Sequence, residues 1–492
     1  MKRLAILSVS VALIMILVMP VAAQDPGSGN VNFTVMNMDA SNQAQVVVKY
    51  INQNGGVDST KNVTIEPRSS AGFPIDQSGL PDNWTGSVIV SADREIVAFA
   101  QARWEGGEYG DGKTAGAYNG FTEGANKLYF PSLAARPGKQ FSRISIQSAE
   151  SESTSETINI TIHYYNRDGT LAHTVNDTLL KGTQKTYNLL DLYNNGDLPT
   201  TSPPGDGWLG AAVVESSSPI AGVATMHWKT YSAAYSAVTS GGTKAFLPSA
   251  TRRLPKGPWY QYTAILVQNL DATTDAQVTV HWYDRSGNEL FSFNDTIPAN
   301  SSHGYNTRWT NSDVPDHTAL HNALGDNWNG SVVIESTNGV NIVAVANLQW
   351  TADSPVGASA TAYTSEPSGY SELFIPATFR RVDGGTWKQF TGLIVQNVGT
   401  TTCNNFTVEW RDRAGNLLLN YTDSLEPNIS HGYNTRYGAD GSDFPSGVDV
   451  TNLGDDFRGS VYINAPGCEL MAIHNTLWPL WTDSTTYNAF GK

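Results

Sequence analysis

Apolar and polar residues alternate with a period of two along most of the chain, and no segment sustains a helical period. Turn residues such as Asp284–Asn288 separate the alternating segments. The apolar segments of one such stretch are AILVQN (264–269), VTVHWY (278–283), ELFSF (289–293), HGYNTR (303–308), SVVIES (331–336) and IVAVANLQW (342–350). This pattern predicts seven or eight short strands in about 120 residues, which is typical of an immunoglobulin-like β-sandwich.

One phrase recurs four times: an aromatic residue, a glycine two positions later, and two apolar strands of which the second ends on tryptophan. The lead aromatics are Trp84, Trp208, Trp328 and Phe457, at steps of 124, 120 and 129 residues, and the closing tryptophans are Trp104, Trp228, Trp350 and Trp478. Such a period indicates an array of one module. We expect an all-β protein of four tandem immunoglobulin-like β-sandwich modules in a row, at residues 24–125, 126–243, 244–371 and 372–492. The recurring tryptophans are interpreted as core residues rather than as a ligand platform.

A short apolar strand ending in Pro131, Pro248 or Pro376 stands at each of the three module joints. Proline cannot donate a ladder hydrogen bond, so these joint strands are expected to end there or to lie at a sheet edge. Three joint strands for four modules leave one end module a strand short. Its unpaired edge would accept a strand from a neighbouring molecule and allow end-to-end assembly. Alternatively, the end module is one strand smaller and capped by a loop.

The first 23 residues begin Met-Lys-Arg, continue through 16 uncharged residues, Leu4–Met19, and end on Val-Ala-Ala. This order predicts a secretory signal peptide, and the apolar run is short for a membrane-spanning helix. We therefore expect a secreted protein, extracellular or at the cell surface, without a transmembrane anchor. Removal of residues 1–23 changes the net charge from −15 to −17, which argues against nucleic acid as a partner.

The chain has two cysteines, Cys403 and Cys468, both in the last module. In an exported protein they are expected to form a disulfide that joins two strands of one sandwich. Two separate thiols, or pairing between chains, are the alternatives.

The strongest local coincidence is the motif SHGYNTR, at Ser302–Arg308 and again at Ser430–Arg436. His303 with Arg308, and His431 with Arg436, form candidate sites for an acidic or sugar ligand. No acidic residue recurs beside them in the sequence, so we predict no nucleophilic catalysis and no enzyme. All four modules share the central aromatic, at Phe73, Tyr187, Tyr305 and Tyr433, which strand packing explains.

Basic residues recur near the joints and are followed by aromatic residues. The basic residues are Arg136, Lys139, Arg252, Arg253, Lys256, Arg380 and Arg381, and the aromatics after them are Phe141, Trp259 and Trp387. They are candidates for docking acidic neighbouring modules or anionic glycans, or for simple interdomain packing. Trp259, Trp309 and Trp387 are candidate carbohydrate platforms if they are exposed.

Metal and modification signals are weak. The nine histidines do not cluster with cysteines or carboxylates, so no cofactor is expected. Ca²⁺ at the GDGW, GDNW and GDDF loops is a minor alternative, because these loops lack the order of acidic residues in a calcium loop. Asn-x-Ser/Thr glycosylation acceptors occur at Asn32, Asn62, Asn83, Asn159, Asn176, Asn294, Asn300, Asn329, Asn405, Asn420 and Asn428.

The modules resemble tandem β-sandwich repeats in uncharacterised secreted proteins of filamentous green non-sulfur bacteria. The segments that carry the resemblance are VQN followed by VTVHWYDRSGN, DTIPANSSHGYN, NWNGSVVIES, GAYNGF and KLYFPSL. The resemblance implies an extracellular sandwich array and supplies no catalytic residues.

Three functions follow from these observations, in order of preference. The first is a secreted structural or adhesive cell-surface protein, a semi-rigid rod that assembles end to end into fibres with itself or with other surface proteins. The second is a carbohydrate-binding protein that uses exposed aromatic rings. The third, a hydrolase, would need two carboxylates about 5–10 Å apart in a cleft, and no such pair recurs between the modules.

Overall fold

The computed structural model describes residues 11–17, 27–106, 113–150, 156–201, 205–254, 260–351, 358–438, 442–481 and 483–492. It confirms the predicted all-β sandwich fold. The only α-helices of the described residues are the short α1 (Leu189–Asn194) and α2 (His317–Leu324), and single 3₁₀ turns occupy Ile75–Gln77, Val450–Leu453 and Pro479–Trp481.

The strands fall into consecutive groups along the chain, here called units 1 to 4. Unit 1 contains β1 (Val11–Leu17), β2 (Gly27–Asn37), β3 (Ala44–Asn52), β4 (Val57–Ile65), β5 (Ser70–Phe73), β6 (Gly86–Ala92), β7 (Ile96–Gly106) and β8 (Lys113–Asn119). Unit 2 contains β9 (Ala125–Arg136), β10 (Gln140–Ser148), β11 (Thr157–Asn166), β12 (Leu171–Leu180), β13 (Gln184–Asn188), β14 (Trp208–Trp228) and β15 (Ser232–Ser236).

Unit 3 contains β16 (Lys244–Arg253), β17 (Gln261–Asn269), β18 (Ala276–Asp284), β19 (Glu289–Ile297), β20 (Ser302–Asn306), β21 (Asn327–Ser336), β22 (Ile342–Trp350) and β23 (Ser359–Thr364). Unit 4 contains β24 (Glu372–Asp383), β25 (Thr386–Asn397), β26 (Cys403–Asp412), β27 (Leu417–Leu425), β28 (Ser430–Asn434), β29 (Asp456–Asn464), β30 (Leu470–Trp478), β31 (Asp483–Asn488) and β32 (Phe490–Gly491).

Each unit is a sandwich of two antiparallel layers with a recurring strand order. In unit 3 the outer layer has the order β19-β18-β21-β16, and the inner layer consists of β20, β17, β22 and β23. Unit 1 repeats this order as β4-β3-β6-β1 and β5-β2-β7-β8. In unit 2 the single 21-residue strand β14 runs through both layers. The pairings of the second with the fifth strand and of the third with the sixth are also those of immunoglobulin domains.

The recurring tryptophans belong to the sandwich cores. Of the lead aromatics and closing tryptophans, all except the half-buried Trp228 are at most 7% exposed. The glycine two residues after each lead aromatic allows this packing: a Cβ on Gly330 would lie 1.9 Å from the carbonyl oxygen of Tyr283 and 2.9 Å from the Trp328 ring. A side chain at this position is therefore sterically forbidden, which explains why the aromatic and the glycine recur together.

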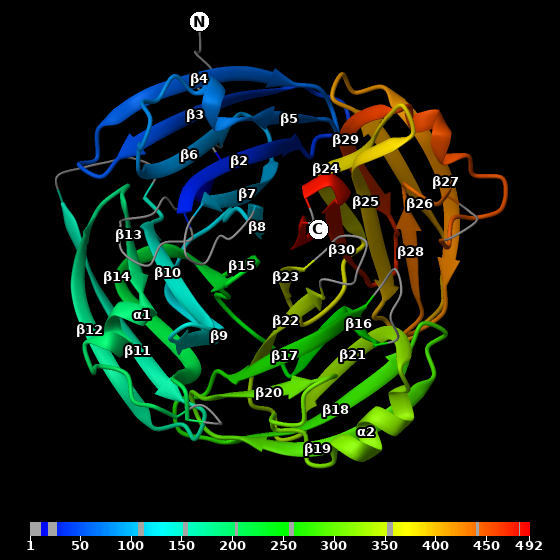
Figure 1. Cartoon of the computed structure of the whole chain (residues 1–492). Helices are drawn as coiled ribbons and strands as arrows, with labels where there is room; N and C mark the ends of the chain where they lie inside the picture. Colours follow the sequence, from blue (N-terminus) through cyan, green and yellow to red (C-terminus); the bar gives the residue numbers. More distant parts are fainter. Residues whose placement is uncertain are drawn as a thin grey trace, which may run out of the picture.

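The units form a closed ring, so the expectation of a row was wrong. Figure 1 shows the units around a common centre, with the blue strands of unit 1 beside the orange and red strands of unit 4. Phe99 of unit 1 stacks on Tyr487 of unit 4 with 4.3 Å between the ring centroids. The Asn119 side chain donates a hydrogen bond of 2.9 Å to the backbone carbonyl of Asn488.

Four short strands, β8, β15, β23 and β31, meet at the centre of the ring, and we call them the axial strands. Ser236 Oγ donates to the carbonyl of Asn119 at 2.8 Å, and Asn488 Nδ2 donates to the carbonyl of Thr364 at 2.8 Å. Neighbouring axial strands approach so closely that a Cβ on Gly116 would lie 2.8 Å from the Ala234 nitrogen. Small Ala, Ser, Thr and Gly residues in these strands therefore allow the units to converge.

An arginine in a hairpin turn locks three of the four joints between units. Each guanidinium lies against a glycine of the next unit, in the pairs Arg167 with Gly304, Arg285 with Gly432 and Arg413 with Gly72. The last pair joins unit 4 to unit 1, so the closing joint uses the same contact as the two joints before it. The corresponding turn of unit 1 contains Asn-Gly-Gly without an arginine, and the joint to unit 2 uses a 2.7 Å hydrogen bond from Ser87 Oγ to the Gly182 carbonyl.

The joint strands β9, β16 and β24 continue past their prolines, so the prediction that they end there was wrong. In each, the register with the neighbouring strand shifts around the proline, for example between Leu247 and Ala250 of β16. A bulge at this point removes the need for the missing N–H donor. The alternative prediction, a position at a sheet edge, was also wrong, because each joint strand lies between two paired strands, for example β16 between β21 and β17.

Candidate ligand clefts between the units

His303 and His431 are held by aspartates that the sequence reasoning missed. His303 Nδ1 lies 2.7 Å from Asp295 Oδ2, and the Tyr305 hydroxyl donates to the same oxygen at 2.9 Å. Asp423 makes the equivalent contacts with His431 and Tyr433, both at 2.6 Å. The statement that no acid accompanies these histidines was therefore wrong. The signal was an aspartate eight residues before each histidine, on the preceding strand.

These Asp-His-Tyr groups tie two strands together, and only their tyrosines, Tyr305 and Tyr433, line a cavity between units. Burial alone would raise the pKa of Asp295, but hydrogen bonds from His303 and Tyr305 lower it below its ordinary value. The same opposing effects lower the pKa of Asp423. Unit 2 has a similar group with a lysine in place of the histidine: Asp177 accepts hydrogen bonds from Lys185 and Tyr187.

Three of the predicted basic residues brace their own unit. Arg252 donates to the Thr307 carbonyl at 2.7 Å and to Asp326 at 3.0 Å. Arg380 bonds the Gly454 carbonyl at 3.0 Å and also Asp455, and Arg381 bonds Asp456 at 2.8 Å. Lys256 and Trp259 lie outside the described residues.

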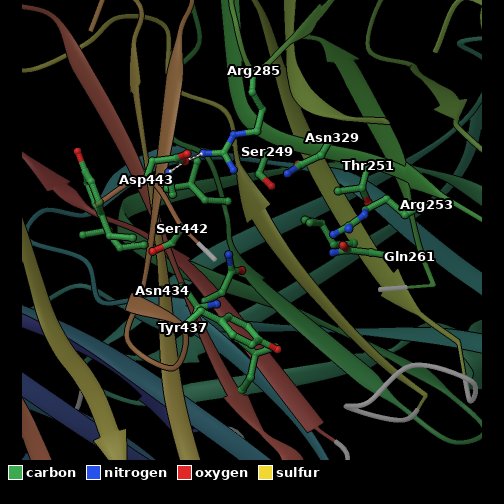
Figure 2. Close-up of a pocket in the computed structure, with 18 of the residues that line it drawn as sticks. Ser249, Thr251, Arg253, Gln261, Arg285, Asn329, Asn434, Tyr437, Ser442 and Asp443 are labelled. Carbon is green, nitrogen blue, oxygen red and sulfur yellow. Dashed lines mark hydrogen bonds and ion pairs between the residues drawn. The ribbon is translucent and has the colours of Figure 1, made fainter. Parts of the chain in front are cut away.

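The joint between units 3 and 4 contains a cavity of about 410 Å³, here called cleft 3/4. Figure 2 shows its polar lining, with Ser249, Thr251 and Asn329 from unit 3 and Asn434 and Ser442 from unit 4. Arg285 forms an ion pair with Asp443 across the joint (Figure 2). Asp443 also accepts a 2.7 Å hydrogen bond from the Gly432 nitrogen, so this ion pair is anchored to the backbone of unit 4.

The joint between units 2 and 3 contains the equivalent cavity, cleft 2/3, of about 560 Å³. Arg167 and Asp313 form its ion pair at 3.2 Å, and the Gly304 nitrogen donates to Asp313 at 2.7 Å. The aromatic residues of the lining are Trp228, Tyr231, Tyr262, Tyr305 and Trp309. The predicted basic residues Arg136 and Lys139 also line it, and both form ion pairs with Asp206. Amides and hydroxyls line it as well, among them Asn306, Asn311, Ser312, Asn347 and Gln349.

Each cleft carries one exposed aromatic ring at the same position, four residues after the shared tyrosine. Trp309 in cleft 2/3 is 49% exposed and Tyr437 in cleft 3/4 is 37% exposed, and no other large aromatic of the described residues is as exposed as these. Arg308 lies 4.4 Å from the centroid of Trp309, and Arg436 lies 5.2 Å from that of Tyr437. The structure thus places Arg308 and Arg436 against aromatic faces, whereas His303 and His431 contact Asp295 and Asp423.

Two further predicted residues have different positions. Arg253 lines cleft 3/4 and bonds Asn327 at 3.3 Å, and burial lowers the pKa of its guanidinium. Trp387 is half-buried beside Arg380 and Arg436 and does not line either cleft.

The predicted disulfide between Cys403 and Cys468 is present, with 5.4 Å between the Cα atoms. No group of three or more His, Cys, Asp or Glu side chains in the described parts of the chain could hold a metal ion. Of the eleven glycosylation acceptors, Asn32, Asn300, Asn329 and Asn428 are half-buried and the other seven are exposed. Asn83, Asn300, Asn405 and Asn428 have positive φ angles of 65°, 60°, 55° and 64°, a conformation that asparagine tolerates well.

No described helix is long and apolar enough to span a membrane. The sequence matches no protein-family model and no curated protein. Among solved structures, Thermotoga maritima 1070 is 15% identical, with 22% of this chain and 91% of that chain covered and a TM-score of 0.18. A glycoside hydrolase family 32 protein from Bifidobacterium adolescentis is 7% identical over 98% of this chain and 95% of that chain, with a TM-score of 0.14. Similarity this low supports no inference about function.

Proposed function

We propose that this protein is a secreted, non-catalytic adhesive protein of the cell surface that binds glycans in the clefts between its units. The observation that carries the proposal is the exposed aromatic ring at the same position of both clefts, Trp309 and Tyr437. An exposed ring beside amides and hydroxyls suits a sugar, which has apolar C–H faces and polar edges.

The charge distribution favours a neutral ligand. Arg167 and Arg285 are paired with Asp313 and Asp443 at the joints, so they offer no unpaired charge to an anionic sugar. Arg136 and Lys139 are likewise paired with Asp206. Apart from these and Arg253, the polar groups of the linings are mainly neutral amides and hydroxyls. These groups donate and accept hydrogen bonds without the desolvation cost of a free charge.

The N-terminal sequence and the disulfide support an extracellular location, because disulfides persist in oxidising compartments. Units 1 and 4, the two ends of the expected row, contact each other at the closing joint. The proposal therefore keeps the adhesive role and leaves out the end-to-end fibre.

The test is a screen of purified protein against neutral and charged oligosaccharides, followed by calorimetric titration of the best ligand. We expect binding to a neutral oligosaccharide, and we expect Trp309→Ala and Tyr437→Ala together to weaken it by at least roughly tenfold, the loss of an aromatic platform. Leu171→Ala is the matched control, because Leu171 is a 54% exposed apolar side chain on β12, outside both linings. Equal affinity in the double variant and the control would refute the assignment of the clefts.

A further inference from the structure

Unit 1 differs from the other units at the position of the joint strand. In units 2, 3 and 4 the joint strand pairs with the strand that follows the lead aromatic. In unit 1 this position beside β6 is held by β1, with Leu13 opposite Val90 and Met15 opposite Val88. Because β1 lies within residues 1–23, the predicted signal peptide, export would remove it.

Loss of β1 would uncover both backbone and core. Val88 and Val90 of β6 are completely buried in the core of unit 1. At the same register in unit 2, the joint strand contributes Phe130 and Leu128, which are also completely buried. Without such a strand, β6 becomes an edge with unpaired N–H and C=O groups beside exposed apolar side chains.

A buried tyrosine gives a second, independent indication that a strand is missing. In units 2 to 4 an axial tyrosine binds the backbone of the joint-strand bulge: Tyr235 with Ser132 at 2.9 Å, Tyr363 with Ser249 at 2.6 Å and Tyr487 with Ala377 at 2.9 Å. Tyr118 is the corresponding residue of unit 1, and it is 1% exposed. Its hydroxyl has no hydrogen-bond partner among the residues that the structure describes. β1 pairs with β6 without the register shift that marks the bulge, so β1 does not replace a joint strand completely.

The chain has no described strand of its own to fill this position. Its three joint strands are each paired within their own unit, and the C-terminal β32 pairs with β24. Only three residues separate the predicted cleavage point after Ala23 from β2, which begins at Gly27, too few to turn back along β6. A second copy has the same strands already in use.

We propose that unit 1 of the exported protein is an acceptor for an extended strand of a partner protein. The register defines this strand as two apolar residues two positions apart, followed by proline and a small residue, as in Leu128–Ser132. The backbone of the bulge would bind the Tyr118 hydroxyl, and the apolar pair would cover Val88 and Val90. The inference rests on the export proposed above, but not on the glycan clefts.

The experiment uses the chain from residue 24 to residue 492 and a labelled peptide, ANKLYFPSLAAR, which is residues 125–136 of this protein. We expect saturable one-to-one binding by fluorescence anisotropy and a rise in the melting temperature of the protein. The matched control peptide carries Leu128→Lys and Phe130→Lys and should not bind, because both side chains face the core. Tyr118→Phe should weaken binding of the original peptide by roughly five- to tenfold, the loss of one hydrogen bond.

A fusion keeps the proposal testable if the chain from residue 24 does not fold alone. The same 12 residues placed directly before residue 24 should restore folding, raise the melting temperature and abolish binding of free peptide, whereas the double-lysine sequence should do none of these.

Three results would overturn the proposal: no binding and no stabilisation by either form of the strand, a mass of the exported protein that still includes residues 1–23, or a dimer in which a second copy fills unit 1. Glycan titration of the same samples distinguishes failure of the strand proposal from failure of the proposed glycan binding, because Trp309 and Tyr437 take no part in strand binding.

Discussion

Replacing Asp295 tests whether the SHGYNTR motif stabilises the fold rather than binding a ligand. Asp295→Ala removes two hydrogen bonds to a mostly buried carboxylate, from His303 at 2.7 Å and Tyr305 at 2.9 Å. It also leaves the completely buried Tyr305 without its acceptor. A charge-assisted hydrogen bond contributes about 1.5–3 kcal/mol and an unsatisfied buried hydroxyl costs about 1–3 kcal/mol, so we expect a loss of roughly 3–5 kcal/mol.

Hydrogen exchange by mass spectrometry measures this loss locally, as the opening free energy of β19 and β20, without assuming that the ring unfolds in one step. Asp295→Asn is the graded control, because it retains an acceptor for Tyr305 and should lose only about 1–2 kcal/mol. If both variants leave the protection of β20 unchanged while glycan binding falls, the structural role assigned to Asp295 and His303 is wrong.

The same aspartate predicts a pH dependence with a defined sign. The pKa of Asp295 is lower in the folded protein than its ordinary value of 3.8. Its contribution to stability is therefore complete above that ordinary value and is lost as the pH falls through the lower folded-state value. The difference in opening free energy between the wild type and Asp295→Asn should be largest near neutral pH and should shrink below about pH 4. A difference that is independent of pH would contradict the assignment of a charged carboxylate.

Three further predictions concern the ring and its ends. Arg413→Ala should loosen the closing joint and speed limited proteolysis near units 1 and 4, whereas unchanged cleavage would show that this arginine does not hold the ring. Replacing Cys403 and Cys468 by serine should destabilise unit 4 by up to about 4 kcal/mol, the loop-closure contribution expected for their separation of 65 residues, measured by denaturation with and without reductant. Burial raises the pKa of Asp483 to about 8, despite the nearby Arg103, so between pH 4 and 8 its ionisation favours the unfolded chain. Asp483→Asn should therefore raise the melting temperature more at pH 7 than at pH 4, and an equal gain at both would refute this.

The local structure was predictable because it depends on neighbouring residues. Period-two alternation identified the strands, and the repeated aromatic-x-glycine phrase located the core. Gly330 cannot be replaced by a larger residue, because its Cβ would lie 1.9 Å from a backbone carbonyl oxygen. This constraint explains why a glycine recurs at this position of the sequence. The disulfide was also predictable, since two cysteines of one unit in an exported chain leave few alternatives.

The ring was not predicted because the residues that form its joints also suit the turns and strands in which they stand. Arg413 occupies a hairpin turn that any polar residue would satisfy, and its contact with Gly72 spans most of the chain. Small residues such as Gly116 also occur in ordinary strands of low β propensity. The sequence therefore does not show that the four axial strands meet at the centre of the ring. The clefts follow from the ring, so Tyr437 had no visible role in the sequence.

Small-angle scattering of the purified monomer tests the closed ring most directly. A compact chain of this length should give a radius of gyration of about 23 Å, somewhat more for a ring, whereas four sandwiches in a row should give roughly 40 Å. The account predicts a value close to the compact limit and a scattering curve that matches the ring. A value near that of a row would contradict the closing joint between units 1 and 4, and with it the geometry on which the clefts depend.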